Sequence, residues 1–127
     1  MPRFVLWSAA LALSGSLCAG PLEDWAEVMA ASARGDHATV VRLTRLLAEA
    51  GDADAQYDLA VLFHVGEDLP QDYVQAWKWY AVAAARFPPE DPTMRERAVK
   101  NRDRVAALMS PAQLAEARRL AREWTPR

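Results

Sequence analysis

Apolar residues recur at helical spacing through the middle of the chain. Four of them, Ala55, Leu59, Leu62 and Phe63, stand at i, i+4, i+7 and i+8. This spacing places them on one face of a helix over about 54–65, which Gly66 ends. Residues 67–71 then form a connection of ordinary length for two antiparallel helices, and Asp72 is placed to cap the second. The pattern predicts a helical hairpin.

The second helix of this hairpin combines small and aromatic residues on its apolar side. The small residues are Ala76, Ala83 and Ala84. They let the partner helix approach closely, while Trp79 and Tyr80 fill the remaining volume. One hairpin cannot bury its own apolar face, so further helices are expected on both sides.

The upstream segment supplies one such neighbour. A shift of 36 residues aligns Asp36 with Asp72, which is within the period range of helical repeats. The register holds for one helix only, because the connection at Gly35 is shorter than the one after Gly66. The first helix of this earlier unit is predicted over 25–33.

Two more helices are expected after the proline-rich break at 88–92. Asp91 caps the first of them, with Pro92 at its first position, and this helix is predicted over 93–109. The last helix opens with an N-cap, a first-turn proline and the return half of a capping box, which are Ser110, Pro111 and Gln113. Its apolar stripe consists of Leu114, Ala117, Ala121 and Trp124. An atypical end pair is typical of solenoid caps.

The segment 51–87 resembles a Sel-like repeat, a tetratricopeptide-related α/α repeat. The family pattern is A-x-x-x-L-(G/A)-x-x-(Y/F)-x-x-G, followed by (V/L)-x-Q-D-Y-x-x-A-x-x-W-Y-x-x-A-A. The matching residues are Ala55, Leu59, Ala60, Phe63 and Gly66, then Leu69, Gln71, Asp72, Tyr73, Ala76, Trp79, Tyr80, Ala83 and Ala84. The resemblance implies a concave surface for partner proteins or envelope components, without catalysis. One secreted subfamily carries a cysteine pair in each repeat, and this chain has none.

We therefore predict an all-α fold, a short α/α solenoid of antiparallel helix pairs with C-terminal capping helices. The helical-repeat domain covers 21–124. It comprises a degenerate repeat at 24–50, a clear Sel-like repeat at 51–87 and a C-terminal helical pair at 92–124. A length of 127 residues suits one domain of this size.

The N-terminal residues 1–19 have the order of a secretory signal peptide. Arg3 precedes an apolar run over 4–13, and small residues follow before Gly20. The run is too short to span a membrane. We expect cleavage after Ala19 and a periplasmic or secreted protein; an uncleaved anchor is the alternative. Lipidation of Cys18 is less favoured, because Leu17 precedes it where a small residue is usual.

Charge is uneven along the rest of the chain. Residues 21–85 hold 4 basic and 11 acidic side chains, whereas 86–127 hold 10 basic and 6 acidic ones. Arg97, Lys100 and Arg104 share one helix face, which is either a contact for an anionic surface such as a membrane or glycan, or an ordinary solvated face. Nucleic acid is not an expected partner, because the net charge is negative.

Catalytic, cofactor and metal motifs do not stand out. His37 and His64 are 27 positions apart, without an HExxH motif, a cysteine pair or a glycine-rich phosphate loop. His64 does lie near Glu67, Asp68 and Asp72, which could supply acid and base groups. A small envelope hydrolase is therefore the alternative function, and the Sel-like resemblance with the expected export implies cell wall or a β-lactam as its substrate.

Four residues are candidates for partner binding. Tyr57, Val61 and His64 stand at i, i+4 and i+7, and they either line a concave groove or contact the preceding repeat. Trp77 either packs on the helix after the proline break or is exposed as an anchor for a partner. The sequence thus predicts an exported, non-catalytic adaptor with an unidentified protein partner.

Overall fold

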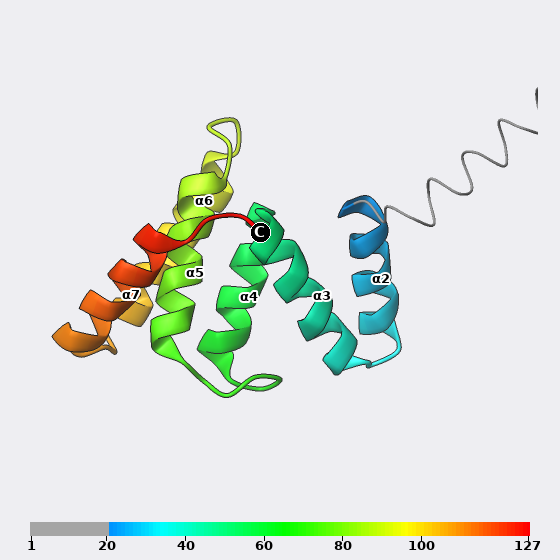
Figure 1. Ribbon diagram of the computed structural model, residues 1–127, viewed down its shortest axis with the longest axis horizontal. Helices are drawn as coiled ribbons and strands as arrows, with labels where there is room; N and C mark the ends of the chain where they lie inside the picture. Colours follow the sequence, from blue (N-terminus) through cyan, green and yellow to red (C-terminus); the bar gives the residue numbers. More distant parts are fainter. Residues whose placement is uncertain (1–20) are drawn as a thin grey trace, which may run out of the picture.

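The computed structural model describes residues 21–127, which fold into six α-helices and no β-strand (Figure 1). The helices are α2 (Pro21–Ala33), α3 (His37–Ala50), α4 (Ala53–Val65), α5 (Tyr73–Arg86), α6 (Pro92–Ala106) and α7 (Pro111–Glu123). The predicted signal peptide and Cys18 lie outside the described residues. Within these residues no helix combines the length and apolar character needed to cross a membrane.

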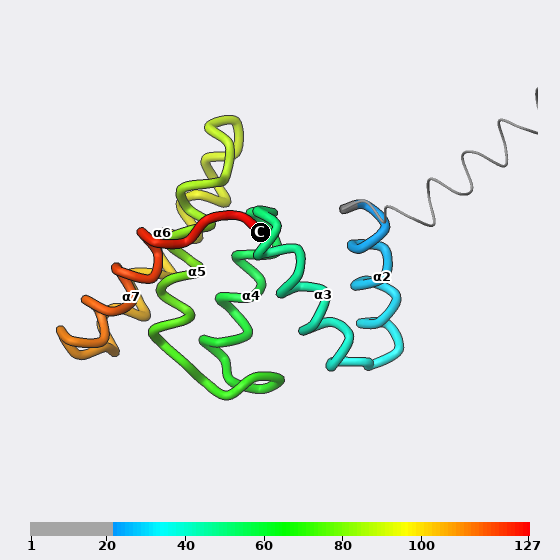
Figure 2. The backbone as a smooth tube through the Cα atoms, viewed as in Figure 1, coloured from blue at the N-terminus to red at the C-terminus, as the bar shows by residue number. Residues whose placement is uncertain are grey.

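The helices form a short solenoid. Consecutive helices pack side by side from α2 to α6, and α7 packs against α5 (Figure 1). Helix α5 therefore has three neighbours, α4, α6 and α7. After α7 the chain turns back across the array, and the C-terminus lies near the end of α3 (Figure 2). The all-α, helical-repeat prediction is confirmed.

The 36-residue register is visible in the helix boundaries. Helices α3 and α5 are both 14 residues long, and each starts directly after an aspartate that caps it. The Asp36 carboxylate accepts a hydrogen bond from the Thr39 backbone N–H at 3.2 Å, and Asp72 accepts one from Gln75 at 3.1 Å. The connection before α3 is four residues shorter than the one before α5, so the register holds for one helix only, as predicted.

Two predicted helix ends differ from the structure. Helix α2 already includes Pro21, the first residue that the structure describes, and so extends beyond the predicted start at residue 25. Helix α6 ends at Ala106 and not at 109. The extended backbone that Ser110 needs as N-cap of α7 requires the chain to leave the helix first.

The core lies between α3, α4 and α5. Leu47, Leu59, Trp79 and Tyr80 are almost fully buried there. Gln56 is buried among them, and its side-chain amide nitrogen Nε2 donates a hydrogen bond to the Ala48 carbonyl at 3.0 Å, which ties α4 to α3. A smaller cluster joins α5 to α6 through Ala83, Ala84, Phe87 and Ala98.

Replacing Ala83 with leucine tests the close packing at this second cluster. Ala83 is fully buried between side chains of α4, α5 and α6, so the larger side chain should overpack the crossing. We expect a loss of about 1–3 kcal/mol in unfolding free energy, measured by thermal melts. Ala85→Leu is the matched control, because Ala85 is exposed on the same helix. Equal melting temperatures for the wild type and Ala83→Leu would contradict a close crossing.

Candidate functional site

Tyr57 joins three helices. It is half-buried on α4, and its hydroxyl accepts a hydrogen bond from Asn101 Nδ2 of α6 at 2.7 Å. Its ring meets the Tyr80 ring of α5 edge-on, with 5.6 Å between centroids. These contacts reach the following helices, whereas the sequence-based alternatives were an open groove or the preceding repeat.

His64 is directed into the interface between α4 and α5. Its Nδ1 lies 3.2 Å from the Tyr80 hydroxyl, and its ring packs edge-on against the Tyr73 and Tyr80 rings. Burial, followed by the proximity of Tyr57, raises the pKa of Tyr80 above its ordinary value. Tyr80 therefore stays protonated, and its hydroxyl can donate a hydrogen bond to His64 Nδ1.

Val61 lies beside the loop that follows α4. It is half-buried and lines a small hollow of about 110 Å³ together with Leu62, Val65, Glu67 and Asp68. The three residues at i, i+4 and i+7 therefore do not line one shared hollow. Their part in partner binding stays a prediction.

The loop carboxylates have other partners than His64. Asp68 Oδ2 lies 3.5 Å from Nδ1 of His37, and Asp72 caps α5. Glu67 lines the hollow beside Val61, of which His64 is not a part. Among residues 21–127 no group of three or more histidine, cysteine, aspartate or glutamate side chains is arranged to hold a metal ion. The acid–base cluster considered from the sequence is thus not gathered around His64.

Trp77 packs against the C-terminal helices. Its side chain is 9% exposed, and the Arg102 guanidinium of α6 lies 5.8 Å from the centre of its ring. The exposed edge of the ring borders a hollow of about 240 Å³ beside Arg118 and Arg122 of α7. Of the two placements considered from the sequence, the structure has the packed one.

The basic residues Arg97, Lys100 and Arg104 of α6 are all exposed. Arg104 donates a hydrogen bond to the Asn101 side chain at 3.3 Å. No further contact in the described part of the chain distinguishes an anionic-surface site from a solvated face here.

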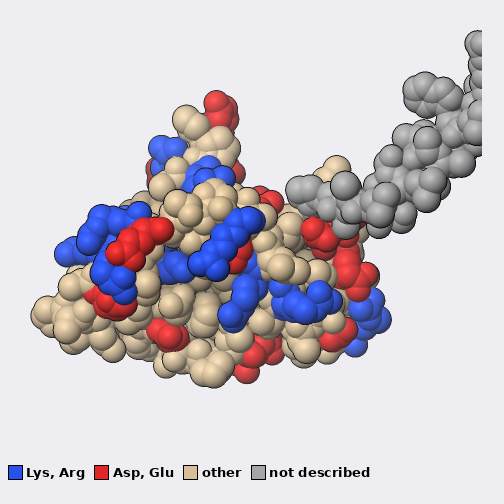
Figure 3. Space-filling view, viewed as in Figure 1, with Lys and Arg blue, Asp and Glu red and all other residues tan. Residues whose placement is uncertain are grey.

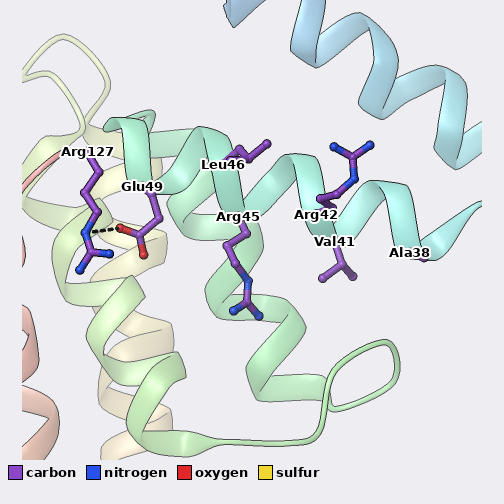
Figure 4. Close-up of a pocket in the computed structure, with 7 residues that line it drawn as sticks. All are labelled: Ala38, Val41, Arg42, Arg45, Leu46, Glu49 and Arg127. Atoms are coloured by element: carbon purple, nitrogen blue, oxygen red, sulfur yellow. Dashed lines mark ion pairs between the residues drawn. The ribbon is translucent and has the colours of Figure 1, made fainter.

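A hollow of about 680 Å³ lies on the outer face of α3 (Figure 4). Its lining consists of Ala38, Val41, Arg42, Arg45, Leu46 and Glu49 of α3 with Arg127 of the C-terminal tail. The opposite face of α3 buries Leu43, Thr44, Leu47 and Ala48 in the core. Because these two sets alternate at helical spacing, packing one set inward presents the other to solvent. We refer to this region as the α3 hollow.

The C-terminal tail forms one end of the α3 hollow. The Arg127 backbone N–H donates to the Glu49 carbonyl at 2.7 Å, and Trp124 Nε1 donates to the Glu49 carboxylate at 3.3 Å. The Trp124 ring packs edge-on against Trp79 of α5, with 5.9 Å between centroids. The tail thereby brings the last residue of the chain beside a helix about 80 positions earlier.

Cations cluster around the α3 hollow. Arg42 makes no hydrogen bond or ion pair within residues 21–127, and Arg45 lies over the Phe63 ring at 5.9 Å. Lys78 of α5 sits next to the tail, in a second hollow that shares Glu49 and Arg127 with the first. Burial lowers the pKa of Lys78; Glu49 opposes this shift and Arg127 adds to it. In Figure 3, lysine and arginine side chains cross this face of the molecule.

Sequence reasoning missed the α3 hollow. The exposed positions of α3 repeat at helical spacing, and that signal was available. The position of Arg127 could not be predicted from the sequence, because it depends on how the tail folds back.

Comparisons of the chain with protein-family models, with curated proteins and with solved structures find no match.

Asp58 on α4 should make stability depend on pH. Burial, with smaller contributions from the Asp54 and Asp52 charges, raises its pKa from 3.8 to about 6. The folded state therefore binds this proton more tightly than the unfolded state, and stability should fall as pH rises from about 4 to 6. Asp58 is nevertheless an exposed residue, so water screens much of this effect.

Asp58→Asn should remove this contribution, so the variant should lose less stability than the wild type between pH 4 and 7. Chemical denaturation at both pH values measures the difference. Glu67→Gln removes one charge from an exposed loop residue and serves as the control. The same pH dependence in Asp58→Asn and the wild type would show that another group is responsible.

Proposed function

We propose that this protein is an exported adaptor that binds a partner protein in the periplasm or cell envelope without catalysing a reaction. The resemblance of 51–87 to a Sel-like repeat supports this proposal, because such repeats serve as protein-binding scaffolds. The confirmed helical-repeat architecture is compatible with it. The observation that carries the proposal is the α3 hollow.

The α3 hollow has the composition of a protein-binding surface. Leu46 is 57% exposed and lies beside Arg42, Arg45 and the half-buried Val41. Arginine is enriched in protein interfaces, and an exposed leucine gains free energy when a partner removes it from water. The hollow is open and large enough for several side chains. We infer that a partner docks along α3.

Photocrosslinking in cells tests this docking face. A photoreactive amino acid in place of Leu46 should give one predominant adduct. The same amino acid in place of Leu108, which is 59% exposed at the turn after α6, is the matched control and should give none. Leu46→Asp should weaken capture about tenfold or more, as expected for an interface anchor, whereas Leu108→Asp should not.

Other results would contradict the proposed docking face on α3 or place it on another helix. Equal crosslinking from both positions would contradict a specific surface on α3. Loss of capture in Val61→Ala and His64→Ala variants that remain folded, with no effect of Leu46→Asp, would place the partner on α4 instead. In that case the adaptor function would stand and the docking face would be wrong.

Export is the second part of the proposal, and it rests on the order of residues in 1–19. We expect the protein in the periplasmic fraction with residues 1–19 removed, as measured by its intact mass. A cytoplasmic protein of full-length mass would contradict export. A mass that includes a lipid on Cys18 would replace the cleaved, soluble form with a lipoprotein.

A further inference from the structure

The α3 hollow is basic although the chain is acidic. Residues 21–127 contain 14 basic and 17 acidic side chains. The side chains that line the hollow instead include three arginines, Arg42, Arg45 and Arg127, and one acidic residue, Glu49. The local charge is therefore opposite in sign to that of the described chain as a whole.

The single acidic side chain that lines the hollow, Glu49, already has partners within the protein. Glu49 Oε2 accepts the hydrogen bond from Trp124 Nε1 at 3.3 Å and lies 3.8 Å from Arg127 Nε. Its side chain is 28% exposed, whereas that of Arg127 is 81% exposed. The ion pair is thus long, and its arginine is exposed to solvent. Arg127 can therefore turn toward another carboxylate.

Arg42 and Arg45 are available to a ligand. They stand three positions apart on α3, and in Figure 4 their side chains leave the exposed side of the helix in different directions. Within residues 21–127 Arg42 makes no hydrogen bond or ion pair, and the Arg45 guanidinium makes none either but lies over the Phe63 ring. An arginine stacked on a ring keeps its N–H groups free for a carboxylate.

Apolar side chains lie between and beside these cations. Ala38 and Val41 line the N-terminal half of the hollow. In Figure 4, Val41 lies on the same side of α3 as Arg45, and Leu46 on the same side as Arg42. The lining of α3 from Ala38 to Glu49 extends about 16 Å at the rise of an α-helix, which equals about five residues of extended chain. The surface therefore suits a short segment that carries both carboxylates and an apolar side chain.

We propose that the α3 hollow binds an acidic linear segment of the partner protein, about five residues long. Two of its carboxylates pair with Arg42 and Arg45, and an apolar side chain covers Leu46. Arg127 takes part by exchanging Glu49 for a carboxylate of the segment. This inference rests on the adaptor function and adds the chemistry of the partner. A lipid headgroup would use the arginines but not the apolar strip.

A peptide library tests the charge of the partner. The probe is a bead-displayed library randomised at five positions between Gly-Ser flanks and incubated with the purified protein. We expect the recovered peptides to be enriched in aspartate and glutamate and to contain an apolar residue. Binding of a recovered peptide should weaken at least tenfold in Arg42→Glu/Arg45→Glu and in Arg42→Gln/Arg45→Gln.

The matched control is Arg118→Glu/Arg122→Glu, which reverses two exposed arginines of α7 and should leave peptide binding unchanged. Circular dichroism verifies that each variant is folded. Recovery of no acidic peptides, or equal binding by the Arg42/Arg45 and control variants, would overturn the inference. So would binding to phosphatidylglycerol vesicles that depends on Arg42 and Arg45 while no peptide binds.

The two proposals fail separately. If the protein crosslinks through position 46 and Arg42→Glu/Arg45→Glu leaves this capture intact, the partner is not acidic and the adaptor function remains. If position 46 yields no specific adduct in cells while acidic peptides bind the hollow, the chemistry of the hollow is right and the docking of a cellular partner there is wrong.

Discussion

The packing of α5 against three other helices is the constraint on which the structure depends. Seven of its 14 residues are buried, and they face α4, α6 and α7. Close approach on one side requires Ala76, Ala83 and Ala84, while Trp77 and Trp79 fill the wider spaces on the others. Exposing any of these apolar faces of α5 to water would cost free energy, so the C-terminal helices α6 and α7 must pack onto it. The tail that follows α7 is thereby carried toward α3.

The fold was predictable because its signals are local. Capping aspartates, the glycine after α4, the prolines at 92 and 111 and the spacing of apolar residues all act within a few positions. Gly66 illustrates this: its backbone has a φ of 78°, and an added Cβ would lie 2.7 Å from the Gln71 side chain. The end of α6 differed because Ser110 must leave the helical conformation to cap α7.

The candidate site was harder to predict because its residues meet only in the folded protein. Tyr57 and His64 have the spacing of groove residues, but their polar groups contact Asn101 and Tyr80 on other helices. Spacing on one helix does not show what the next helix presents to it. The α3 hollow combines a helix face, which the sequence indicates, with Arg127, whose position depends on α7 packing against α5.

The tail contact also bears on the order in which the molecule can form. Most contacts in a helical repeat join neighbouring elements and can develop early, whereas the bond from Trp124 to Glu49 spans 75 residues. Closing such a distance costs chain entropy, which is recovered only when the intervening helices are in place. The α3 hollow is therefore completed last, and it can lose its tail-side wall while the helices behind it stay folded.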